Sequence, residues 1–279
     1  MPDNNTNKKQ IKKITSGKIG LAVITYKRVH LLEQCLQYLA DYNWGGSDER
    51  VVIVDELYSE NYAHLSNDNF YFAANGGVAS AKNRALQLLL DRGCEHIFLL
   101  EDDVAVIDAN CCEKYINYAK KHHLEHLNFG LHGPANKGLK FYYKGICCYP
   151  RYFGAFSYYT AQCLNQVGLM DEKFFNSQEH VEHSYRISLA GLTLPFWYCA
   201  DHPNSHLLLK DLDPIQAHSV ITPTSHQLKL EENAKAYWIE KYGQWMPDRP
   251  KFKYIYQRRK MKASVSKRVK KISNFLKSL

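Results

Sequence analysis

The chain has 279 residues, of which 45% are hydrophobic, so it can form one large domain or two small ones with a sizeable core. No apolar run approaches the roughly 20 residues that span a bilayer, so no transmembrane helix is predicted. The net charge of +8 is uneven, because residues 251–279 hold eleven Lys or Arg and no acid. Without those eleven charges the chain is mildly acidic, at −3. This distribution argues against a nucleic-acid-binding surface spread over the fold.

The eight cysteines include two adjacent pairs and no Cys-x-x-Cys spacing. This pattern favours neither a zinc site nor a disulfide framework, and we expect reduced, semi-buried thiols in a cytosolic protein. Residues 1–17 are polar and basic and lack the apolar segment of a secretory signal. We therefore expect a flexible lead-in at this end.

Apolar strands and amphipathic helices alternate along the first half of the chain. In order, we expect a strand over 18–28, a helix over 29–42, a strand over 50–57, a helix over 75–93, a strand over 95–103 and a helix over 110–122. Continuous apolar strands that alternate with helices predict βαβ units and a parallel sheet. In such sheets, ligands bind beyond the carboxyl ends of the strands.

Three of these predicted strands end in polar residues. They end in Thr25 and Tyr26, in Asp55 and Glu56, and in the run Glu101–Asp103. Adjacent carboxylates repel one another and are costly to desolvate, unless a cation lies between them. Oxygen-rich clusters suit Mg²⁺ or Mn²⁺, whereas a solvated turn is the alternative for a single acidic strand end. Several such ends at one edge of a sheet predict a binding site.

The second half of the chain is less regular. Residues 131–160 mix Gly, Pro and Tyr in the manner of binding loops and short strands, and two short helices that end at glycines are expected over 161–168 and 179–191. In order, the segments "VITYKR", "VDELYS", "NGGVASAKNRAL", "LEDDV" and "VGLMDEKFFNSQEHVEHSYRISLAG" resemble the motifs of family 2-type, inverting glycosyltransferases of the bacterial surface-glycan type. The resemblance runs from about Ile19 to about His206.

This resemblance implies a GT-A fold, which is a Rossmann-like α/β fold with a mostly parallel sheet flanked by helices. Residues 18–125 would form its nucleotide-sugar-binding half, and residues 126–250 its acceptor-binding and catalytic half. The implied nucleotide-sugar-binding residues are Thr25, Tyr26, Asp55, Gly77, Lys82, Glu101 and Asp102. Asp55 would accept a hydrogen bond from uracil, and Lys82 would approach the base or the diphosphate. Asp103 would be the main ligand of Mn²⁺ or Mg²⁺, and His202, with His206 as the alternative, would be a further ligand.

The catalytic base departs from the family pattern. The family carries a Glu-Asp pair, and here Glu179 and His180 stand at those positions. An inverting transfer needs a base within hydrogen-bond reach of the acceptor hydroxyl. Glu179 is our first candidate and His180 the second, with a role in orienting the acceptor as the alternative for His180. Glu182 is a weaker third candidate, and a solvated helix face is the alternative for Glu182 and His183.

Residues 251–279 place apolar side chains at spacings of three and four, with Lys and Arg on the other faces. This pattern predicts a basic amphipathic helix that binds an anionic membrane surface. The alternative is a helix that packs on the rest of the protein or mediates an oligomer.

Together these observations predict a metal-dependent transferase. It would move a hexosyl or N-acetylhexosaminyl group, with inversion, from a UDP-sugar to a glycan or lipid-linked acceptor. It would act in the synthesis of a surface polysaccharide or lipooligosaccharide. It would be a peripheral protein on the cytoplasmic face of the cell membrane. One alternative is a sugar-nucleotide nucleotidyltransferase, although the segment "ITYKRVHLL" lacks the Gly-rich signature of that class. The other is a non-catalytic nucleotide-sugar-binding module.

Overall fold

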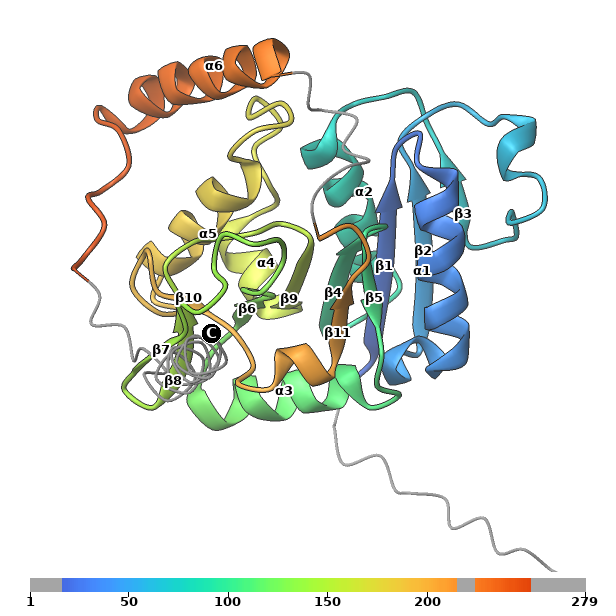
Figure 1. The fold of residues 1–279 in the computed structure, drawn as a ribbon, viewed down its shortest axis with the longest axis horizontal. Helices are drawn as coiled ribbons and strands as arrows, with labels where there is room; N and C mark the ends of the chain where they lie inside the picture. The colour runs from blue at the N-terminus through green and yellow to red at the C-terminus, as the bar shows by residue number, and fades with distance from the viewer. Residues whose placement is uncertain (1–16, 215–223, 252–279) are drawn as a thin grey trace, which may run out of the picture.

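The computed structural model describes residues 17–214 and 224–251 and shows a mixed α/β fold built around one six-stranded sheet (Figure 1). The strand order is β3-β2-β1-β4-β9-β6. The strands are β1 (Ile19–Thr25), β2 (Glu49–Val54), β3 (Phe70–Phe72), β4 (His96–Glu101), β6 (His126–Asn128) and β9 (Phe156–Thr160). Strands β3, β2, β1 and β4 are parallel, and β9 pairs antiparallel with both β4 and β6. The predicted α/β class with a mostly parallel sheet flanked by helices is confirmed.

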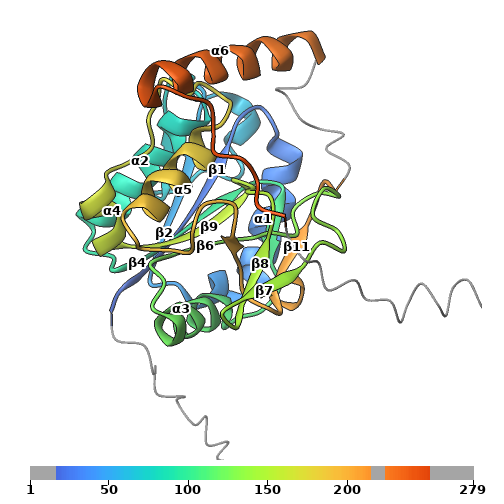
Figure 2. The same ribbon diagram turned by 90° about the vertical axis from the view of Figure 1, so that its left-hand side faces the viewer.

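Helices cover both faces of the sheet because alternate residues of a strand point to opposite sides. Leu21 and Val23 of β1 pack in one layer with α1 (Val29–Asp41) and α3 (Cys111–His122). Ala22 and Ile24 pack in the other layer. The helices of that second layer are α2 (Val78–Asp91), α4 (Ala161–Val167) and α5 (Glu179–Leu189). Figure 2 shows α2, α4 and α5 together on one side of the sheet and α1 and α3 on the other.

Two smaller sheets extend this core. One contains β7 (Phe141–Tyr143), β8 (Ile146–Tyr149) and β10 (Cys199–Ala200), and the other contains β5 (Val104–Val106) and β11 (Leu209–Asp211). Three 3₁₀ helices cover Asn43–Gly46, Glu60–Tyr62 and Ser205–Leu207. The pairing of β11 with β5 brings the segment after β11 to the acidic end of β4, where Leu212 N–H donates to the Asp103 carbonyl at 2.7 Å.

The last described helix, α6 (Thr224–Tyr242), lies above α5, on the side of the molecule where the parallel strands have their carboxyl ends (Figures 1 and 2). It buries a narrow stripe of Leu230, Ala234 and Trp238. Ala234 and Trp238 belong to a third core cluster, together with Phe174 and Trp197. This helix was not predicted from the sequence.

The predicted C-terminal helix over 251–279 and the lead-in over 1–17 lie almost wholly outside the described residues, and both stay predictions. Across 17–214 and 224–251, no helix is long and apolar enough to span a bilayer. All eight cysteines are buried free thiols.

Candidate functional site: a cleft at the carboxyl ends of the strands

A cleft of about 320 Å³ lies where β1, β2 and β4 end. Its wall from the first half of the chain includes Thr25, Tyr26, Asp55, Glu101 and Asp103. Its wall from the second half includes Phe153, the loop 176–178, Glu179, His180, and Gln227 and Glu231 of α6. Parallel strands bring their carboxyl ends to one edge, so side chains that are far apart in the sequence meet there.

The two aspartates after β4 share one guanidinium. Thr25 Oγ1 donates a hydrogen bond to Asp102 Oδ2 at 2.5 Å. Arg28 contacts the other oxygen of Asp102, and its Nη1 lies 3.1 Å from Asp103 Oδ2. Burial raises the pKa of Asp102 to about 7, although Arg28 acts against this shift. Burial and the charge of Glu101 also raise the pKa of Asp103. The single guanidinium of Arg28 therefore does not fully compensate the two buried carboxylates.

Asp103 suits a divalent cation. Its Oδ1 is buried and has no hydrogen-bond partner among the described residues. Carboxylate oxygens are the ligands that Mg²⁺ and Mn²⁺ prefer. Within 17–214 and 224–251, no three His, Cys, Asp or Glu residues are grouped so that they could hold a metal alone. Such a cation would therefore share its coordination with substrate phosphates and water, as Mg²⁺ commonly does.

Lys82 does not reach the cleft surface, contrary to the predicted contact with the base or diphosphate. Its side chain is 1% exposed, and its Nζ lies 2.8 Å from Glu101 Oε1 and 3.5 Å from Glu179 Oε1. The Nζ also donates to the Gly154 carbonyl at 3.1 Å. Burial lowers the pKa of Lys82, but the two carboxylates outweigh burial and raise it. The ammonium thus joins the end of β4 to the start of α5.

Glu179 and His180 form a pair at the start of α5. His180 Nδ1 lies 3.1 Å from Glu179 Oε1, and His180 lines the cleft. Burial raises the pKa of Glu179, but His180 and Lys82 outweigh burial and hold this pKa at about 2. An ionised carboxylate can only accept a hydrogen bond, so Nδ1 carries the hydrogen of this contact, and in the neutral ring the lone pair is then on Nε2. The pair has the arrangement of a base that is held by an orienting carboxylate.

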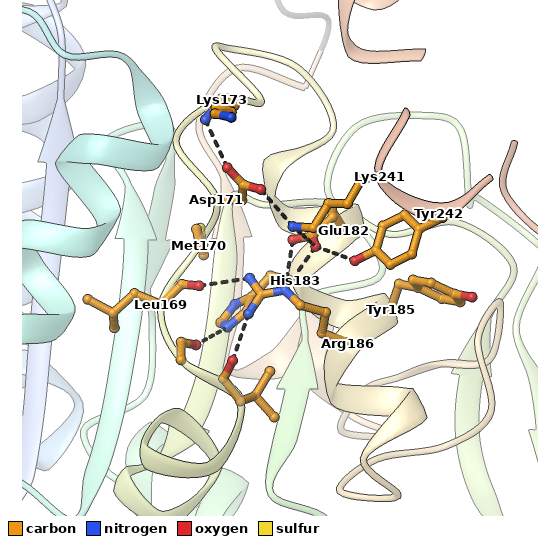
Figure 3. Close-up of polar contacts among 12 residues, drawn as sticks. Leu169, Met170, Asp171, Lys173, Glu182, His183, Tyr185, Arg186, Lys241 and Tyr242 are labelled. Carbon is orange, nitrogen blue, oxygen red and sulfur yellow. Dashed lines mark hydrogen bonds and ion pairs between the residues drawn. The ribbon is translucent and has the colours of Figure 1, made fainter. Parts of the chain in front are cut away.

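Glu182 is not placed to act as a base, and it does not lie on a solvated helix face either. It is fully buried, as is His183, which is hydrogen-bonded to the Gly168 carbonyl. Arg186 Nε donates to both oxygens of Glu182 at 2.9 and 3.0 Å. From α6, Lys241 Nζ and Tyr242 Oη donate to Glu182 Oε1 at 2.9 and 2.6 Å. Figure 3 shows these groups converging on one carboxylate, which therefore joins α5 to α6.

Asp55 shapes the turn that opens α2. Its two oxygens accept the backbone N–H groups of Gly76 and Gly77, each at 3.0 Å. Gly77 has φ +86°, and a Cβ there would lie 2.7 Å from the ring of Phe175. Asp55 lines the cleft and Gly77 does not, so Gly77 acts through its backbone. The contact of Asp55 with a nucleotide base stays a prediction.

The structure does not bring His202 to the cleft. Its ring packs against Tyr115 and Tyr118 of α3. The cause is the neighbouring Asp201, which accepts hydrogen bonds from Tyr115 Oη, Ser205 Oγ and the Gly130 N–H, and so holds this segment against α3. We therefore do not assign His202 as a metal ligand.

Arg28 and His132 line the cleft, although the sequence did not indicate them as residues of the site. His132 is 6% exposed and lines the cleft, with its Nδ1 3.5 Å from Asp211 Oδ2. The signal for Arg28 was present in "VITYKR", where a cation follows the strand end directly. No comparable sequence signal marked His132, because its position in the cleft depends on a loop that packs against β11.

Gly154 offers a direct test of this packing. A Cβ at residue 154 would lie 2.6 Å from Lys82 Nζ and 3.0 Å from His180 Cγ. We expect Gly154→Ala to displace both groups and to lower the free energy of unfolding by about 1–3 kcal/mol. Urea denaturation measures this loss. Gly138→Ala is the comparison variant, because that glycine has φ +80° and nothing within 4 Å, so its substitution adds backbone strain without a steric clash. A Gly154→Ala variant that is as stable as the parent chain would contradict the close packing.

No protein family model matches the chain. An uncharacterized glycosyltransferase, R363 of Acanthamoeba polyphaga mimivirus, is 24% identical over 254 residues, which cover 82% of this chain and 94% of that protein.

Two solved structures are also similar in part. The mannosyltransferase PcManGT of Pyrobaculum calidifontis, in complex with GDP-Man and Mn²⁺, has a TM-score of 0.44 and 14% identity, with 68% of this chain and 58% of that chain covered. The present chain thus spans little more than half of that protein. The catalytic domain of Drosophila β1,4-galactosyltransferase 7, in complex with xylobiose, has a TM-score of 0.47 and 16% identity, with 77% and 79% covered.

Proposed function

We propose that the protein is a glycosyltransferase that moves a sugar from a nucleoside diphosphate sugar to a hydroxyl group of an acceptor. The observation that carries this proposal is the cleft at the strand ends, where Asp103 presents a buried carboxylate oxygen without a hydrogen-bond partner among the described residues. The similarity to an uncharacterized glycosyltransferase over most of both chains supports the same class.

In the proposed reaction, the acceptor oxygen attacks the anomeric carbon of the donor sugar and the nucleoside diphosphate leaves from the opposite face, which inverts the anomeric centre. His180 Nε2 takes the proton of the attacking hydroxyl, and Glu179 holds the ring through Nδ1. The pKa of about 2, held down by His180 and Lys82, favours an orienting role for Glu179 over the role of the base. Mn²⁺ or Mg²⁺ bound at Asp103 would stabilise the charge that develops on the diphosphate.

The donor is proposed to be a UDP-sugar that carries a hexosyl or N-acetylhexosaminyl group. Thr25, Tyr26 and Asp55 line the part of the cleft that would hold the nucleotide. The acceptor is proposed to be a glycan or a lipid-linked glycan in the synthesis of a surface polysaccharide or lipooligosaccharide.

The proposed location is the cytoplasmic face of the cell membrane, with residues 251–279 on the anionic surface. The eleven Lys and Arg of that segment support this proposal. Sedimentation with anionic liposomes tests it, and equal sedimentation of the intact chain and of a version that ends at Pro250 would refute it.

Donor hydrolysis tests the proposed activity before an acceptor is known. Water can replace the acceptor slowly, so incubation of the protein and Mn²⁺ with a panel of UDP-sugars should release UDP from one of them. Chelation of the metal should stop the release. If no UDP-sugar, GDP-sugar or CDP-sugar is turned over, the protein is not a glycosyltransferase of this kind.

A further inference from the structure

Helix α6 is fixed to the rest of the protein at its C-terminal end. Besides the bonds from Lys241 and Tyr242 to Glu182, Lys241 Nζ lies 2.6 Å from Asp171 Oδ2. Tyr237 Oη donates to the same oxygen of Asp171 at 2.8 Å. Figure 3 shows that Asp171 and Glu182 come from the loop before α5 and from α5 itself. The position of α6 is therefore set by the helix that carries Glu179 and His180.

The N-terminal half of α6 borders the cleft. Gln227 and Glu231, one helical turn apart, both line it, and Gln227 Nε2 donates to Glu231 Oε1 at 3.3 Å. Glu232, the next residue, is exposed and does not line the cleft. Gln227 and Glu231 line the same cleft as His180, so a molecule that fills the cleft contacts both this turn of α6 and His180.

This wall carries the carboxylate of Glu231, and the amides of Asn176, Gln178 and Gln227 contribute neutral donors and acceptors. Among the described residues that line the cleft, Arg28 is the only Lys or Arg, and its guanidinium is paired with Asp102 and Asp103. An anionic group against this wall would be repelled, whereas the hydroxyl groups of a neutral sugar can hydrogen-bond to it.

We infer that this turn of α6 forms part of the acceptor subsite, and that Glu231 selects a neutral acceptor sugar over one that carries a carboxylate. This inference rests on the proposed function, because it takes the molecule opposite the donor to be an acceptor. The proposed selection depends on charge, because the group that would repel an acidic sugar is the carboxylate of Glu231 at the cleft surface.

A matched pair of sugars tests the inference. Methyl glucoside and methyl glucuronide differ in one carboxylate, and saturation-transfer NMR with the full chain, UDP and Mg²⁺ measures the dissociation constant of each. We expect the glucoside to bind about fivefold more tightly than the glucuronide. Glu231→Gln should remove most of this preference and Glu231→Lys should reverse it, whereas Glu232→Gln should leave it unchanged.

The inference is overturned if the glucuronide binds as tightly as the glucoside, if neither sugar binds, or if Glu231→Lys keeps the preference of the parent chain. Turnover of nucleotide sugars, measured on the same samples, separates this failure from a failure of the proposed function. Turnover without discrimination removes only the role of Glu231. Discrimination without turnover keeps the charge-selective wall and removes the transferase reaction.

Discussion

The His180→Ala variant should transfer sugar about 10²- to 10⁴-fold more slowly than the parent chain, with its affinity for nucleotide unchanged. The reason is that His180 lines the cleft and is held through Nδ1 by Glu179, so its Nε2 is available for the proton of the acceptor. The steady-state kcat, measured with a nucleotide sugar and an acceptor or with water in its place, checks this loss. The His206→Ala variant, at an exposed histidine outside the cleft, is the control.

The dependence of the rate on pH follows from the same pair. Glu179 has a pKa of about 2 and stays ionised throughout the working range, so protonation of Glu179 should not limit the rate there. Glu179→Gln should retain more activity than His180→Ala, because it removes an orienting group and keeps the base. Full activity in His180→Ala together with an inactive Glu179→Gln would make Glu179 the base.

A second large effect is expected at Glu182. The Glu182→Gln variant keeps the side-chain volume but leaves Arg186 and Lys241, which are 20% and 27% exposed, without their shared anion. Removal of one partner from a buried ion-paired group costs about 3–5 kcal/mol, and we expect the free energy of unfolding to fall by this amount. Urea denaturation measures it, and Glu232→Gln, on the exposed face of α6, should change it by less than about 0.5 kcal/mol. A loss for Glu182→Gln as small as that of the control would mean that the network does not hold α6.

The central parallel strands were predictable because each is a buried, continuous apolar run, as β1, β2 and β4 are. Helix α6 was not predictable in the same way. Its buried stripe of Leu230, Ala234 and Trp238 is narrow, and the exposed Leu228 and Ile239 blur the pattern. Its anchor is a carboxylate 60 residues earlier in the chain, which no local pattern reveals.

The same distinction holds for the candidate site. Thr25, Asp55 and Asp103 meet in one cleft because parallel strands share an edge, and the sequence shows this directly. Lys82 was expected at a ligand, but its buried position between Glu101 and Glu179 depends on a loop and on a helix from the second half. Histidines were the least predictable residues, because only long-range packing decides which of the thirteen lie in the cleft.

The most direct test of the nucleotide site is titration calorimetry of UDP into the full chain, with and without Mn²⁺. The proposed site predicts micromolar binding that needs the metal and that is lost in Asp103→Asn. Asp68→Asn, at an exposed position outside the cleft, should bind as the parent chain does. Failure of UDP, GDP and CDP alike to bind, or binding that neither the metal nor Asp103→Asn alters, would contradict a metal-assisted nucleoside diphosphate site at the ends of these strands.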